Sequence, residues 1–448
     1  MKVDLLQGNI TKSLSKLALP LMGMSFLQMA YNLTDVYWIG RLGDGPVASV
    51  GTGGLLLWLG MGIHMIAQLG SQVYVGQNLG AKDYQKASDY AYGGIILSLI
   101  VSLTLGFVYT FFNEQIVGFF GLNEASVVQD TQTYLRVTGG LVVFSLLAKL
   151  LTTLITVTGN SKTPLIATTL GLVFNMILDP MLIFGIGIFP EMGVLGAAIA
   201  TVFAQFIVVS VLIFYVLGER QLFGHIKLRK IPSMDIFTSI IKLGFPATIQ
   251  SVAYPLISMY ISRMVATFGD SAVAVQRVGS QIESISWMTS DGFAVAINSF
   301  IAQNYGANNI QRAKEGFKSG LRIMLCVGSF STLLLIFGAK PLFSIFLTDP
   351  ATVAMGTSYL VILGVSQLFM CVEILSGSAM NAFGKSKIPA TINIIFTGLR
   401  IPMAIVLSST VLALDGIWWS ITISSIFKGV ILFIAVVYLF KKVIRHDV

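Results

Sequence analysis

The sequence predicts an all-α polytopic membrane protein made of two repeated halves. Of its 448 residues, 55% are hydrophobic and only 11% are charged, whereas a soluble chain carries roughly 25% charged residues. Apolar stretches of about 20 residues, each long enough to cross ~30 Å of hydrocarbon, recur along the whole chain. These stretches are too long for membrane strands and lack strict alternation, so helices are expected.

Twelve such stretches follow one another, six in each half of the chain. Polar or glycine-containing segments separate them and set the ends of each predicted helix. In order, we expect helices at 14–39, 50–76, 88–113, 130–157, 164–187, 194–217, 237–268, 276–301, 317–339, 353–382, 388–410 and 416–440.

The two halves are copies of one module. Residues 17–88 align without a gap with 243–314, at a constant offset of 226. A second block, 159–164, aligns with 384–389 at an offset of 225. A period of about half the chain is far too long for a solenoid, so one module has been duplicated.

We therefore expect two pseudo-symmetric six-helix lobes, at 1–218 and 236–448. A polar, basic linker at 219–235 joins them on the cytoplasmic side. In a chain this apolar, duplicated halves are typical of transporters whose substrate path lies between two bundles.

The net charge of +8 reflects membrane topology and not nucleic-acid binding. Basic residues such as Lys12, Lys82 and Arg312 gather at helix ends and loops of one side, whereas the opposite loops carry acids such as Asp44 and Asp270. This distribution is the positive-inside pattern, and it predicts that both termini are cytoplasmic. No cleavable signal peptide is visible. A multi-pass protein of a prokaryotic cytoplasmic membrane is expected, with the lipid bilayer as its surroundings.

Four polar residues of the first half should lie close together inside the membrane. A charge there costs about 2.5–3.5 kcal/mol on insertion scales, so each case begins as a functional hypothesis. Counting ~1.5 Å of rise per residue places Asp35, Asp179 and Thr201 in the outer half of the first bundle. Asn175 lies one helical turn from Asp179, on the same face. Purely structural alternatives remain: Asp35 could reach the interfacial water, and Asn175 could hydrogen-bond to a neighbouring helix.

The cluster suits either of two small cations. Two carboxylates, an amide carbonyl and a hydroxyl form an all-oxygen set, which a hard metal ion such as Na⁺ prefers. A proton would fit as well, because two adjacent carboxylates in low dielectric cannot both ionise easily. The sequence therefore predicts a site for Na⁺ or H⁺ at Asp35, Asn175, Asp179 and Thr201.

The second half keeps the frame of the repeat but loses the acids. At the repeat offsets, Asp35 corresponds to Ile261, Asn175 to Arg400 and Asp179 to Ala404. If the acids served packing alone, the second copy should need them too. We infer that the ion site exists once, in the first half.

The second half has a polar set of its own. Two interpretations stay open: the charges hold neighbouring helices together, or they form a site for a cationic substrate or a second proton. Flexible methionines in both halves could line a cavity that repacks around varied apolar ligands. The charged residues are Glu283, Asp291, Glu373, Arg400 and Lys428, and the methionines include Met29 and Met259.

A family resemblance emerges at two motifs. The run Tyr31-Asn32-Leu33-Thr34-Asp35 and the stretch 159–164, followed by Leu178-Asp179-Pro180, resemble the multidrug and toxic compound extrusion (MATE) transporters. The resemblance covers essentially the whole chain. It implies twelve helices in two lobes around a V-shaped cleft, and export of drugs in exchange for inward H⁺ or Na⁺.

By position, the same resemblance makes the four polar residues of the first half the cation site of the N-terminal lobe. Tyr31 and Asn32 would lie nearby as cavity candidates. Some members carry an acid on the seventh helix, where this chain has only Gln250, Tyr254 and Arg263. The chain is therefore more similar to the DinF-like branch than to the NorM type.

These observations predict a secondary active antiporter. It would export amphipathic, mostly cationic drugs or toxic organic compounds in exchange for H⁺ or Na⁺, as a monomer and without a cofactor. A flippase for a lipid-linked substrate is the alternative, which Arg400, Lys428 and Lys149 keep open. A membrane-embedded enzyme or a channel is not expected, because enzymes need a nucleophile–base pair or a metal cluster and the chain shows no His/Cys arrangement. ATP is not expected to drive transport, because no G-x-x-x-x-G-K-[ST] motif is present.

Overall fold

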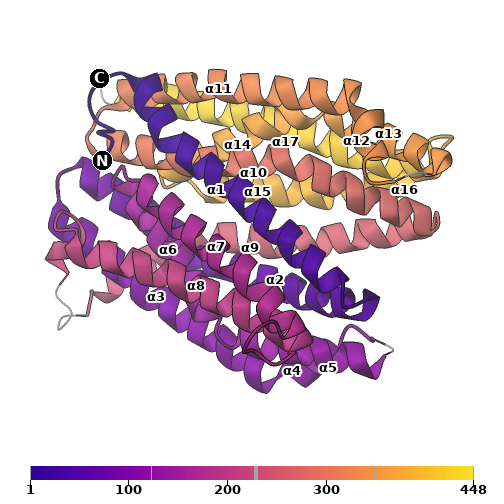
Figure 1. Cartoon of the computed structure of the whole chain (residues 1–448). Helices are drawn as coiled ribbons and strands as arrows, with labels where there is room; N and C mark the ends of the chain where they lie inside the picture. Colours follow the sequence, from indigo (N-terminus) through magenta and orange to yellow (C-terminus); the bar gives the residue numbers. More distant parts are fainter. Residues whose placement is uncertain (1, 123, 227–230, 348, 447–448) are drawn as a thin grey trace. The chain divides into compact units, whose positions relative to one another are not determined.

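A computed structural model describes residues 2–122, 124–226, 231–347 and 349–446. Within these ranges the regular structure is entirely helical (Figure 1). The predicted linker lies partly outside this description, because 227–230 are not among the described residues. The prediction of an all-α fold is confirmed.

Each predicted apolar stretch lies in a long helix or in a broken pair of helices. The elements are α1 (Ile10–Gly40), α2 (Asp44–Gly80), α3 (Tyr84–Phe111), α4 (Asn113–Gly118), α5 (Ala125–Tyr134), η1 (Leu135–Gly139), α6 (Val142–Val157), α7 (Lys162–Phe184), α8 (Gly193–Gly218), η2 (Phe223–His225), α9 (Met234–Ala266), α10 (Asp270–Gly306), α11 (Ile310–Phe337), α12 (Ala339–Ser344), α13 (Pro350–Gly364), α14 (Gln367–Ala382), α15 (Lys387–Gly398), α16 (Arg400–Ser408) and α17 (Ala413–His446).

Length and composition qualify most of these helices as membrane spans. Eight helical segments of the described chain pass such a test, and ten pass if two bent pairs are each one span. The bends are 46° between the segment 125–139 and α6, and 43° between α13 and α14. The two further long helices, α1 and α10, contain 31 and 37 residues but are more polar. Those are the helices that carry Asp35 and Glu283, respectively.

The duplication is visible in the turns as well as in the sequence. Lys82 and Asn308 occupy repeat-related positions, and both adopt the left-handed conformation, with φ of 60° and 56°. The next residue in each copy caps the following helix: Asp83 accepts from the Lys86 amide and Asn309 from the Arg312 amide. An N-cap of this kind satisfies an otherwise orphaned backbone donor. The repeat therefore preserves local backbone geometry.

The packing divides the chain into two compact units. Unit 1 comprises the chain up to Asp4 together with Leu19–Thr248, and unit 2 comprises Leu5–Ala18 and the chain from Ile249 onward. Each of the repeat-related helices α1 and α9 is thus divided between the two units. The predicted lobe boundaries follow the sequence repeat and stay a prediction, as does the V-shaped cleft.

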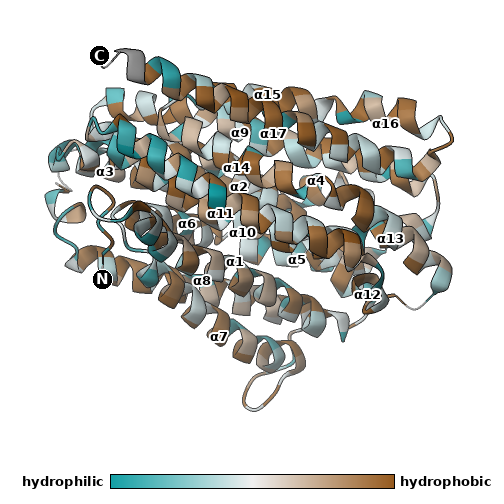
Figure 2. Cartoon of the chain, turned by 90° about the horizontal axis from the view of Figure 1, so that it is seen from above, coloured by the Kyte–Doolittle hydropathy of each residue, from teal (hydrophilic) through white to brown (hydrophobic). Residues whose placement is uncertain are grey.

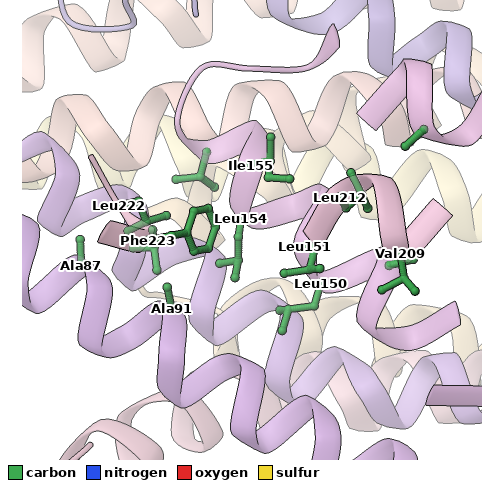
Figure 3. Packing of buried hydrophobic residues seen from close by; sticks show 14 of the residues in the cluster. Ala87, Ala91, Leu150, Leu151, Leu154, Ile155, Val209, Leu212, Leu222 and Phe223 are labelled. Atoms are coloured by element: carbon green, nitrogen blue, oxygen red, sulfur yellow. The ribbon is translucent and has the colours of Figure 1, made fainter. Parts of the chain in front are cut away.

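An apolar core of unit 1 lies where α3, α6 and α8 meet. Figure 3 shows Leu150, Leu154 and Ile155 of α6 pointing among side chains of α3, α8 and the segment around Phe223. Alanines on α3 allow this close approach, since Ala87 and Ala91 are fully buried. The core fixes the helices that position the polar residues of this unit.

Unit 2 is built around aromatic residues on α12, α13 and α17. Phe343 and Trp418 are fully buried, and Tyr359 packs edge-on against Trp418 with ring centroids 5.1 Å apart. Hydrophobic residues run along most of the length of the helices (Figure 2). Many are exposed, as expected for helices whose outer faces contact lipid and not water.

Candidate cation site

One face of α7 carries two polar residues of the candidate site. Asn175 and Asp179 are one turn apart, so they lie on the same face of the helix. Both are completely buried. The Asn175 Nδ2 donates a hydrogen bond of 3.2 Å to the Asp179 Oδ1, which fixes the orientation of the carboxyl group. The next residue, Pro180, has no N–H and so removes one helical hydrogen bond beside the site.

Helix α1 brings the second carboxyl group to this face. The carboxyl groups of Asp35 and Asp179 are close enough to interact electrostatically, and so are Asp35 and the Tyr31 hydroxyl. Tyr31 donates to the Thr201 Oγ1 of α8 at 3.1 Å. The structure therefore brings Asp35, Asn175 and Asp179 together and links Thr201 to them through Tyr31.

Three buried oxygen atoms of this cluster have no donor. They are the Asp35 Oδ1, the Asn175 Oδ1 and the Asp179 Oδ2, and no group in the described part of the chain bonds them. Buried acceptors are almost always satisfied in folded proteins, so three together indicate a site for an external donor or cation. An all-oxygen set of this kind fits a proton or Na⁺. The assignment of these residues as ion ligands remains a prediction.

A protein-family model shows to which family the chain belongs. The model named MatE matches the chain twice, at residues 20–181 and 246–406. The two matches together cover well over half of the chain and follow its internal repeat. The chain belongs to the MatE family.

Members of this family are membrane transporters and not enzymes, and the multi-span membrane architecture agrees with that class. A similar curated protein is the "Probable multidrug resistance protein NorM" of Thermotoga maritima, 27% identical over 423 residues, which cover 94% of this chain and 90% of that protein. The "FAD transporter" of Shewanella oneidensis is 27% identical over 435 residues, covering 95% and 94%.

The MatE fold is also shared with a solved structure. A multidrug resistance MATE family transporter in an outward-facing conformation superimposes with a TM-score of 0.92 at 21% identity, covering 99% of each chain. At this identity the match shows the fold alone. The DinF-like branch within the family stays a prediction.

Tyr134 is a member of this cluster that the sequence did not reveal. It is buried, lies close enough to Thr201, Asp35 and Asp179 to interact with them electrostatically, and immediately precedes the π-helical turn η1. Such π-turns often occur at functional sites. A Cβ on Gly53 of α2 would lie 2.6 Å from the Tyr134 ring, so a residue without a side chain is needed there. Sequence spacing alone could not relate position 53 to position 134.

The polar residues predicted for the second half lie in unit 2 and are mostly paired. Lys428 of α17 donates to the Glu373 Oε1 of α14 at 2.9 Å. Arg400 donates to the hydroxyls of Ser424 and Ser425 at 2.6 and 3.1 Å. These contacts join α14 and α16 to α17, as the packing interpretation requires.

The remaining candidates are less enclosed. Glu283 accepts a hydrogen bond from the Gln367 Nε2 at 3.1 Å, and Asp291 is exposed on α10. Asn32 is exposed and Met29 half-buried on α1, while Met259 is 45% exposed on α9. Their role as substrate contacts stays a prediction.

Proposed function

We propose that this MatE transporter is a secondary active antiporter that exports amphipathic, mostly cationic drugs or toxic organic compounds in exchange for H⁺ or Na⁺. The observation that carries the proposal is the cluster of three donorless buried oxygens on Asp35, Asn175 and Asp179. Among the described residues no base lies at hydrogen-bonding distance from either carboxyl group, and a pair of carboxyl groups without a basic partner has a strong preference for a small cation.

The ion would drive transport by changing the charge of unit 1. With Asp35 and Asp179 in reach of each other, two negative charges in low dielectric repel strongly, and a bound H⁺ or Na⁺ relieves that repulsion. A bound ion can shift a conformational equilibrium only by its differential affinity for the two states. Asp35 and Tyr31 both lie on α1, so α1 is the element whose position would respond.

We infer the cargo from the names of similar proteins and from the negative charge of the candidate cation site. Several relatives with 26–27% identity are named as multidrug resistance or multidrug export proteins. A bound organic cation and a coupling ion would compete for the same negative charge, which gives exchange in opposite directions. FAD is a second cargo to test, because a relative of the same identity is an FAD transporter.

Orientation and assembly complete the proposal. The basic ends of helices, including Lys82 and Arg312, would face the cytoplasm together with both termini. One chain supplies both units, so a monomer is sufficient for function.

The decisive experiment is efflux from proteoliposomes with Na⁺ and pH gradients imposed separately, with ethidium as the cargo. Asp35→Asn and Asp179→Asn should each lower gradient-driven efflux by about tenfold or more, because each removes one charge of the coupled site. Asp89→Asn is the matched control, since Asp89 is a half-buried acid of unit 1 that bonds only Gln85 among the described residues. Full efflux by either site variant under both gradients would refute the proposal.

A further inference from the structure

Unit 2 contains a partly open cavity with several polar residues in its wall, which the cation site does not explain. Its volume is about 150 Å³, and every lining residue belongs to unit 2. A cavity of this size can hold a single six-membered ring, since an engineered cavity of ~150 Å³ binds benzene. The polar residues of its wall are Gln250, Tyr254, Glu373, Asn393, Thr397 and Lys428.

Two acceptors on the wall have no donor. The Glu373 Oε2 and the Asn393 Oδ1 are both buried, and neither is bonded by any group of the described chain. Both residues are more than nine-tenths buried. Buried acceptors in native proteins are nearly always hydrogen-bonded, so these two indicate a bound molecule that donates hydrogen bonds.

The charges around the cavity favour a neutral guest over an ionic one. The Glu373 carboxylate is already paired with the Lys428 ammonium at 2.9 Å. The Arg400 guanidinium lies 5.8 Å from the centre of the Tyr254 ring, so a cationic guest would meet two fixed positive charges. An anionic guest would instead face the unpaired oxygens of Glu373 and Asn393. A neutral guest avoids both repulsions.

We propose that this cavity is a subsite for a neutral primary carboxamide group carried on a small ring. The NH₂ of such a group donates two hydrogen bonds, one for each unpaired oxygen. Gln250 and Thr397 supply donors at the wall for the carbonyl oxygen of the guest, and the Tyr254 ring offers an aromatic face. The inference deepens the proposed export function by naming a chemical group that cargo presents to unit 2.

The test is binding of nicotinamide to the purified full-length transporter in detergent, measured by saturation-transfer NMR without any gradient. Nicotinamide should bind at least about tenfold more tightly than N,N-dimethylnicotinamide, which lacks both N–H groups, a factor equal to 1.4 kcal/mol. The affinity for nicotinamide should also exceed the affinities for the anion nicotinate and for the cation benzylamine. Equal binding of the dimethyl analogue, tighter binding of benzylamine, or no nicotinamide binding would overturn the proposal, the last result indicating a water-filled cavity only.

Variants locate the binding. Asn393→Leu should weaken nicotinamide binding by about tenfold. Asn381→Leu is the matched control, because Asn381 has a similarly unpaired oxygen further along α14 but does not line the cavity. The pair Glu373→Gln and Lys428→Met, combined in one chain, removes both charges together and so avoids an unpaired buried ion. It should also weaken binding; unchanged binding in both site variants contradicts the assignment.

The nicotinamide-binding experiment can succeed or fail independently of the efflux experiment that tests the proposed function. Binding in detergent needs no coupling ion, and Asp35 lies in unit 1. If Asp35→Asn retains gradient-driven efflux, the antiport mechanism fails while the nicotinamide result still stands or falls by itself.

Discussion

At the scale of single residues, the candidate cation site combines predictable and unpredictable members. Asp35 and Asp179 were predictable because a carboxyl group inside an apolar stretch is costly and therefore conspicuous. Tyr134 and Gly53 were not, because a tyrosine and a glycine are ordinary residues of membrane helices. Their relation to the site comes from the packing of α2 against α5, which spacing along the chain does not encode.

Glu219 shows how a carboxyl group behaves just beyond a span. It follows the last residue of α8 and accepts hydrogen bonds from the Lys2 ammonium and the Leu222 and Phe223 amides. Burial opposes ionisation, yet the Lys2 charge and the backbone donors together hold the pKa of Glu219 below its ordinary value of 4.5. Glu219 therefore stabilises the fold in its charged form.

The pH dependence of that stabilisation follows from the lowered pKa. It should be complete above pH 4.5, the ordinary value, and be lost as the pH falls through the lower folded value. Glu219→Gln should cost about 1.5–3 kcal/mol at pH 7, the range for hydrogen bonds to charged groups. Thermal unfolding in detergent at pH 7 and pH 4 should show the difference shrinking at pH 4. Glu315→Gln, on the exposed face of α11, is the control; a difference that grows on acidification would contradict the account.

At the scale of elements, the twelve helical segments were largely predictable and their interruptions were not. Apolar length alone indicated α1 and α10 as spans, although their polar residues keep them below a strict hydropathy criterion. The 46° bend before α6 follows two successive glycines, Gly139 and Gly140, which the sequence contained without revealing a bend. Tertiary contacts decide whether such a pair bends a helix or lies within a straight one.

Close packing of α2 against α9 in unit 1 gives an element-scale prediction. A Cβ on Gly70 would lie 2.3 Å from the Ile240 carbonyl oxygen and 2.8 Å from its Cα, so Gly70→Ala must push two helix backbones apart. We expect a loss of about 1–3 kcal/mol, typical of overpacking. Gly54→Ala, also in α2, meets nothing within 4 Å and should stabilise the helix by about 0.5–1 kcal/mol. Thermal unfolding in detergent compares the two variants with the parent protein. Changes of the unfolding temperature in the same direction for both variants would contradict this packing.

At the scale of the whole molecule, the duplication is preserved in form and altered in chemistry. The family match, the left-handed turns and the helix caps all occur twice. The acids do not: Ile261 and Ala404, which replace Asp35 and Asp179, belong to an apolar cluster of buried residues. Arg400, which replaces Asn175, bonds Ser424 and Ser425 with its own guanidinium. At the repeat-related positions of the described chain, unit 2 therefore does not repeat the two acids and the amide of the candidate cation site.

The expected stoichiometry is therefore one coupled site per chain. If Na⁺ is the coupling ion, equilibrium binding of radioactive Na⁺ to the purified protein should saturate at about one ion per chain. Binding should disappear in Asp179→Asn and persist in Asp89→Asn. If H⁺ is the ion, Asp179→Asn should abolish proton release on cargo binding. Two ions per chain, or binding that survives Asp179→Asn, would contradict a single site.

The division of α1 between the two units has a practical consequence. Residues up to Ala18 of this helix pack with one body, and residues from Leu19 pack with the other. Spin labels at the exposed positions Lys12 and Leu33 would sit on a single continuous helix, yet each would be anchored to a different body. If the two bodies move relative to each other during a transport cycle, α1 has to bend between those labels. The distance between the two labels would therefore report the motion.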